Sequence, residues 1–225
     1  MDINRVIQFA GKDPNWVNKL VLGAALSLVP IVNLTAAGYG ANLFRNVLAG
    51  REDSEVLPEW TNWQDHFMKG LVLFLIGLGY MIVPLAMMAV ALVPMIAGVL
   101  DGRGPTMAFG LAGTMAILGL AVCLALVLTV LSLMGCSLYA ESGSAGDAFQ
   151  FGEILRRIMA APIEFLMAFL VLVLGGMVAS ALAGWIPVVG GLLVNGLAFP
   201  VQLMFWYAMG QMFREHFSGP PQLEL

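Results

Sequence analysis

The chain has 225 residues, of which 60% are apolar and 11% charged, with a net charge of −4 and a mean hydropathy of +0.90. A soluble globular domain carries about 25% charged residues, so this composition excludes one. It predicts an all-α, polytopic membrane protein with one membrane domain of three helical hairpins, the first short or re-entrant, and interfacial amphipathic helices.

The first element, residues 1–15, is predicted to be a short amphipathic helix in the headgroup region. Ile3, Val6 and Ile7 fall on one helical face. The segment has neither a continuous apolar core nor a small-residue cleavage pattern, so we expect no cleaved signal peptide. Trp16 follows it, where an interfacial aromatic anchor is expected.

Residues 16–48 leave two alternatives open. A single crossing over 20–48 would span about 43 Å, against a hydrocarbon core of about 30 Å. Pro30 would also cost that helix a backbone hydrogen bond. The alternative is a broken hairpin of two half-length helices, 16–29 and 35–48, with its turn from Pro30 to Asn33.

The positive charges favour the broken hairpin, because Lys and Arg gather on the cytoplasmic side of a membrane. With the hairpin, nine of the ten basic residues share one side and Arg103 lies opposite. A single crossing divides them four against six. The hairpin would place both termini on the cytoplasmic side of a prokaryotic inner membrane.

The middle of the chain alternates interfacial and membrane segments. Residues 51–69 are expected to be an acidic, solvated loop followed by an interfacial helix. Residues 71–139 read as a kinked transmembrane hairpin that turns at the DGRGP sequence. Residues 140–161 are the third interfacial segment.

The chain ends in a second transmembrane hairpin, 162–213, with its turn at WIPVVGG, and a tail, 214–225. Four tryptophans are predicted to anchor the interfaces. They are Trp16, Trp60, Trp63 and Trp185.

Few polar side chains fall at membrane depth, and these are Asn33, Asn42, Asn195 and Gln202. Asn195 and Gln202 are seven residues apart and so share one helical face. Such a face could form a polar track for a substrate. Interhelical hydrogen bonding is the favoured interpretation, because no charged residue joins them.

We find no pattern that indicates catalysis, a cofactor or a metal. His66 and His216 are expected to be boundary residues without ligand partners. Cys123 and Cys136 fall on one predicted helix, about 20 Å apart, so they are expected to be reduced. No polybasic cluster indicates nucleic acid.

Several motifs resemble those of the prokaryotic membrane-protein family catalogued as domain-of-unknown-function family 4013. They are DPNW at 13–16, VPIVN at 29–33, GY at 38–39, LFRNVLAG at 43–50, LPEW at 57–60, FMKGL at 67–71, AFQFGEI at 148–154 and the terminal GQMFRE. The resemblance covers nearly the whole chain. It implies a multi-pass membrane protein and assigns no activity or catalytic residue.

The leading hypothesis is a non-enzymatic membrane protein that acts through helix packing, as a homo-oligomer or as a structural subunit of a larger membrane complex. Small residues support it, since Ala179 and Ala183 have the spacing of close helix contacts. The alternative is a small permease or lipid-handling transporter that uses the Asn195 and Gln202 face. Membrane lipids are the other expected partners.

Overall fold

The computed structural model describes residues 3–51, 55–186 and 190–217, and these residues form helices and no strand. The helices are α1 (Ile3–Gln8), the 3-10 turn η1 (Ala10–Lys12), α2 (Trp16–Ser27), α3 (Asn33–Leu48), α4 (Trp63–Asp101), α5 (Gly104–Ser142), the 3-10 turn η3 (Asp147–Phe149), α6 (Phe151–Ala160), α7 (Pro162–Ala183) and α8 (Gly190–His216). The centre of the acidic loop, part of the WIPVVGG turn and most of the tail lie outside the described residues.

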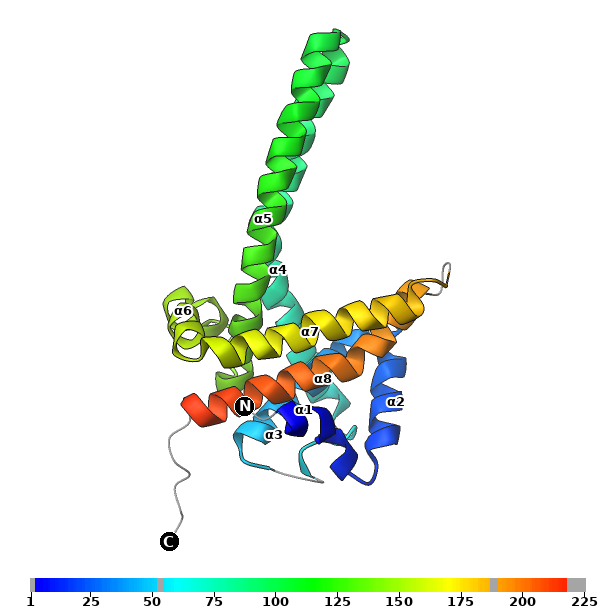
Figure 1. Ribbon diagram of the computed structural model, residues 1–225, viewed down its shortest axis with the longest axis vertical. Coiled ribbons are helices and arrows are strands. Elements are labelled where there is room, and N and C mark those ends of the chain that lie inside the picture. The colour runs from blue at the N-terminus through cyan, green and yellow to red at the C-terminus, as the bar shows by residue number, and fades with distance from the viewer. Residues whose placement is uncertain (1–2, 52–54, 187–189, 218–225) are drawn as a thin grey trace.

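Three of the described helices, α4, α5 and α7, are long and apolar enough to cross a membrane. This confirms the prediction of an all-α protein with membrane-spanning helices. α4 and α5 have 39 residues each, about 58 Å at 1.5 Å per residue and nearly twice the thickness of a hydrocarbon core. Figure 1 shows the α4–α5 hairpin rising far above the other helices, while α7 and α8 run across its base.

Helix α3 is the centre of the base, because it packs against α2, α4, α5 and α8. Its contact with α4 is made backbone to backbone through two glycines. A Cβ atom on Gly38 would overlap the His66 carbonyl, and one on Gly70 would overlap the Leu34 carbonyl. Glycine at these two positions is therefore what lets the two helices approach so closely.

The segment 16–48 forms two helices rather than one. α2 ends at Ser27 and α3 begins at Asn33, with Pro30 in the turn between them. Ile31, in the same turn, has a φ of 73°, a left-handed conformation that is unfavourable for a β-branched residue. The two helices lie in contact with each other.

Two predicted interfacial segments differ from the structure. Residues 63–69 are no separate helix, because α4 starts at Trp63 and continues without a break to Asp101. Helix α5 likewise runs on to Ser142, where Gly143 ends it in the left-handed conformation, so α6 covers only the later part of 140–161. Helical periodicity in the sequence predicts that a segment is helical, but it does not show where one helix ends and the next begins.

Candidate functional site

A cavity lies in the base, where the helices leave a space between two packed groups. α7 packs mainly on α8, whereas α4 and α5 pack on α3. The cavity between these groups has a volume of about 480 Å³. That is within the range of about 300–1,000 Å³ typical of small-molecule sites.

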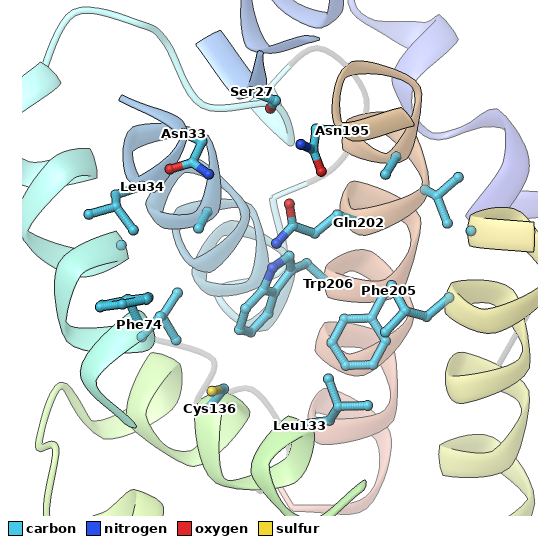
Figure 2. Close-up of a pocket in the computed structure, with 17 residues that line it drawn as sticks. Ser27, Asn33, Leu34, Phe74, Leu133, Cys136, Asn195, Gln202, Phe205 and Trp206 are labelled. Carbon is cyan, nitrogen blue, oxygen red and sulfur yellow. The ribbon is translucent and has the colours of Figure 1, made fainter. Parts of the chain in front are cut away.

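The polar groups of the cavity gather at one end. Ser27 at the end of α2, Asn33 at the start of α3, and Asn195 and Gln202 on α8 all line it. Figure 2 shows the three amides turned toward the same space, with the Trp206 indole beneath Gln202. The seven-residue spacing on α8 and the helix break after Ser27 bring these side chains together.

The other end of the cavity is apolar. It is lined by Phe74 of α4, Leu133 and Cys136 of α5, and Phe205 of α8. Leu172 and Gly176 of α7 close one side. The three described helices that are long and apolar enough to span a membrane, α4, α5 and α7, therefore all contribute to the wall.

The cavity amides lack protein partners. Among the described residues, the side chains of Asn33, Asn195 and Gln202 make no hydrogen bond, and the buried Nε1 of Trp206 has no acceptor. Ser27 differs, since its Oγ donates to the Gly23 carbonyl at 2.8 Å. Asn33 and Asn195 are exposed and Gln202 is half-buried, so within the described part of the chain their amides make none of the interhelical hydrogen bonds that the sequence favoured and stay open to the cavity.

The fourth predicted residue, Asn42, lies elsewhere. Its amide donates to Asp65 Oδ2 and to His66 Nδ1, both at 2.8 Å, and accepts from Lys69 Nζ at 2.6 Å. His66 in turn contacts the Glu59 carbonyl through Nε2 at 3.0 Å and is buried. His66 is thus part of the core rather than the boundary residue expected, and Asn42 joins α3 to α4.

A second polar cluster is buried around Lys19. Its Nζ lies 2.7 Å from Asp13 Oδ2 and 2.5 Å from Glu59 Oε1, and it donates to the Leu57 carbonyl at 3.3 Å. The side chains of Lys19 and Asp13 are only 5% and 3% exposed. This cluster ties α2 to the loop before α4, so one of the predicted loop carboxylates has a structural partner.

The predicted tryptophan anchors divide into two groups. Trp16, Trp63 and Trp185 are exposed, Trp185 to 86%. Trp60 differs from the expectation, because it is buried, stacks on Tyr39 with ring centroids 4.2 Å apart, and donates to the Lys19 carbonyl at 3.1 Å. The loop that carries Trp60 folds back onto α3, which a helical wheel cannot show.

The described residues contain no group of three or more His, Cys, Asp and Glu side chains that could hold a metal ion. None of the described residues that line the cavity is charged or is a histidine. The arrangement can bind an uncharged molecule through amide hydrogen bonds and apolar contacts. It offers no nucleophile–base pair for a reaction.

The sequence interpretation missed two features. Trp206 was not identified as a cavity residue, although it lies four positions after Gln202 and so on the same helical face. An exposed stripe of small residues on α5 was also missed. Its members are Ala108, Ala112, Ala116, Gly119 and Cys123.

A comparison with models of known protein families finds a match over most of the chain. Residues 22–188 match the model of the family described as protein of unknown function (DUF4013). No curated protein and no solved structure matches the chain.

Proposed function

We infer a function from the premise that this chain belongs to the DUF4013 family, whose description assigns no activity. Because three of its described helices are long and apolar enough to span a membrane, the chain is a membrane protein. Within that class, we propose that it is a lipid-handling protein or small permease, which takes a molecule from the bilayer into the cavity between α3, α5 and α8. It performs no covalent chemistry.

The unpartnered amides carry this proposal. Asn33, Asn195 and Gln202 converge on one space without a protein hydrogen bond. Asn33 and Asn195 are exposed and Gln202 is half-buried, so each amide can bond a molecule in the cavity without first breaking a protein hydrogen bond. A site of this kind, apolar with a few convergent polar groups, is typical of small-molecule binding.

Orientation in the membrane forms part of the proposal. Arg103 lies at the tip of the α4–α5 hairpin, whereas Lys19, Arg45 and Lys69 belong to the base. By the positive-inside rule the base and both termini face the cytoplasm of a prokaryotic cell. An Arg51→Cys variant should then react with an impermeant thiol reagent only from the cytoplasmic side, and an Arg103→Cys variant only from the other side. Reaction of both from one side would overturn this orientation.

Native mass spectrometry of the purified full chain tests the binding function. We expect the wild type to retain a lipid-sized adduct, and the double variant Asn195→Leu, Gln202→Leu to lose it. Asn18→Leu is the matched control, because Asn18 is an exposed amide on α2 outside the cavity. No adduct on the wild type, or an equal adduct on all three proteins, would overturn the proposal.

A second candidate function, a homo-oligomeric structural subunit, has support from the α5 stripe. Ala108, Ala112, Ala116, Gly119 and Cys123 are all exposed and at 100° per residue they fall within one narrow face. Nothing lies within 4 Å of a Cβ built on Gly119. Small residues on one face allow two transmembrane helices to pack closely.

The exposed thiol of Cys123 allows a direct test of this second candidate. If two copies pack along the stripe, oxidation in membranes should link Cys123 to Cys123 and give a dimer on non-reducing gels. Cys123→Ser should abolish the dimer and Cys136→Ser should leave it unchanged, because Cys136 faces the cavity. A monomer under all conditions would count against this candidate.

A further inference from the structure

The cavity is polarised, and this polarity specifies the ligand. Its upper end in Figure 2 holds the Asn33, Asn195 and Gln202 amides, and its lower end holds Phe205 and Leu133. A ligand that satisfies both ends must itself have a polar head and an apolar body. A wholly apolar ligand would leave the amides unpaired, and a wholly polar one would face aromatic and aliphatic walls.

The chemistry of the polar end restricts the charge of the head. The described lining residues contain no Arg, Lys, His, Asp or Glu. Phosphate and carboxylate groups are bound in proteins chiefly by Arg, Lys and backbone N–H groups. An ionic head that enters the cavity would therefore give up part of its hydration without gaining a counter-ion, which is unfavourable.

The same groups favour a head that both donates and accepts hydrogen bonds. Each amide offers a carbonyl oxygen and an NH₂ group. The Trp206 Nε1 is buried against Gly40 of α3 rather than open to the cavity, so the amides are the polar groups that a head would meet. A hydroxyl can satisfy both kinds of group, and a carbonyl can satisfy the donors.

We propose that the cavity binds an uncharged amphiphile, with a hydroxyl-bearing head at Asn33, Asn195 and Gln202 and an acyl or similar chain against Phe205 and Leu133. Monoacylglycerol represents this chemical class. The proposal rests on the proposed function and adds a selection against charge. Gln202, at the junction of the polar and apolar ends, is the residue that determines specificity.

Photo-labelling with a matched pair of lipids tests the selection. The wild type in nanodiscs is exposed to a monoacylglycerol or to the corresponding acylglycerol phosphate, each with the same diazirine in its chain, and labelled residues are mapped by mass spectrometry. The two probes differ only in the phosphate. We expect the neutral probe to label the apolar end, around Leu133 and Phe205, at least about tenfold more than the anionic probe, which corresponds to about 1.4 kcal/mol.

The variants sharpen the test. Gln202→Glu, which keeps the size of the side chain and adds a negative charge, should reduce labelling by the neutral probe, and Asn18→Leu should leave it unchanged. Equal labelling of the cavity by both probes would overturn the charge selection while leaving a lipid-binding cavity. If neither probe labels the cavity but native mass spectrometry still shows an adduct lost with Asn195 and Gln202, the proposed class is wrong and the binding function stands. Labelling absent together with the adduct overturns both.

Discussion

The outer half of the α4–α5 hairpin and the base of the molecule are held together in different ways. In the base, specific side-chain contacts hold the segments together. The Tyr39 hydroxyl donates to the Pro58 carbonyl at 2.8 Å, and the Phe44 and Phe213 rings pack edge to face with centroids 5.1 Å apart. In the outer hairpin, small residues bring two backbones together. Gly98 and Gly110 form this contact, and the Thr114 hydroxyl donates to the Ala91 carbonyl at 2.9 Å.

The outer surfaces of the hairpin and the base also differ in how specific their side chains must be. Large apolar side chains of the hairpin point outward, including Ile82, Leu100 and Phe109, the last 79% exposed. Lipid tails solvate such residues as well as other apolar residues do, so one can replace another. The base holds the polar clusters and the cavity. We conclude that the hairpin serves as a membrane element tolerant of apolar substitution, whereas the base depends on particular residues.

The largest expected effect comes from the glycine contact between α3 and α4. Gly70→Leu would drive a side chain into the Leu34 carbonyl, so we expect loss of the folded protein, a destabilisation above about 5 kcal/mol. Gly77→Leu on the same helix should be tolerated, because nothing lies within 4 Å of a Cβ at Gly77. Size-exclusion chromatography in detergent measures both, and similar behaviour of the two variants would remove the distinction between packed and lipid-facing positions.

The second effect concerns the buried ion pairs of the base. Lys19→Met leaves the Asp13 carboxylate buried without its partner, which typically costs about 3–5 kcal/mol. Lys69→Met should cost less, because the Lys69 and Asp65 side chains are 18% and 36% exposed and Asp65 keeps its hydrogen bond from Asn42. Thermal unfolding of the detergent-solubilised variants gives the comparison.

A second substitution controls for the nature of the Lys19 effect. Adding Asp13→Asn to Lys19→Met removes the unpaired charge and should recover part of the lost stability. If Lys19→Met and Lys69→Met lower the melting temperature equally, the burial of an ion pair does not determine how much it stabilises the folded protein.

The third effect is small and lies in the hairpin. Thr114→Val keeps the shape of the side chain and removes the hydrogen bond to Ala91, which joins α5 to α4. Interhelical bonds of this kind contribute about 0.6 kcal/mol on average. Thr129→Val is the control, since the Thr129 hydroxyl bonds within its own helix to Ala125. A drop in melting temperature for Thr129→Val as large as for Thr114→Val would contradict an interhelical role.

The helices were predictable where the sequence carries local signals. Pro162 begins α7, and Gly102 and Gly143 end α4 and α5 in the left-handed conformation, as proline and glycine commonly do. The common face of Asn195 and Gln202 also followed from spacing alone. Asn33 and Asn42 are nine residues apart, which places them about 180° from each other on a helix. Spacing could therefore have separated Asn42 from the cavity.

What could not be predicted depends on contacts distant in sequence. Trp60 is buried because its loop returns to Tyr39 and Lys19, and nothing in the local pattern distinguishes it from the exposed Trp63. The cavity itself arises from the way α7–α8 packs apart from α4–α5. Periodicity gives the face of each helix, but the space left between helix pairs follows from their crossing geometry.

The smallest expected effect lies at the edge of the base, on α6, where the ion pairs are partly exposed. Glu153 accepts hydrogen bonds from Arg156 Nε at 2.8 Å and Arg157 Nε at 2.7 Å, and these bonds with the two guanidinium charges lower its pKa from 4.5 to about 2. Because the folded-state pKa is depressed, the stabilisation is fully present above about pH 4.5 and is lost as the pH falls toward 2. Glu153→Gln should therefore lower the melting temperature slightly at pH 7, and the difference from the wild type should shrink between about pH 4.5 and 2.

The Glu153 effect stays small because Arg157 keeps other partners, Glu141 at 2.7 Å and the Phe213 and Phe217 rings, each with its centroid 4.8 Å from the guanidinium carbon. A partly exposed pair contributes at most about 1 kcal/mol. Glu164→Gln provides the matched control for removing one negative charge. Glu164 is on α7, and its Oε1 lies 3.9 Å from His216 Nε2. A difference for Glu153→Gln that persists unchanged to about pH 3 would show that shape rather than charge at position 153 supports α6. In that case the base would depend on specific packing right out to its edge, as it does around α3.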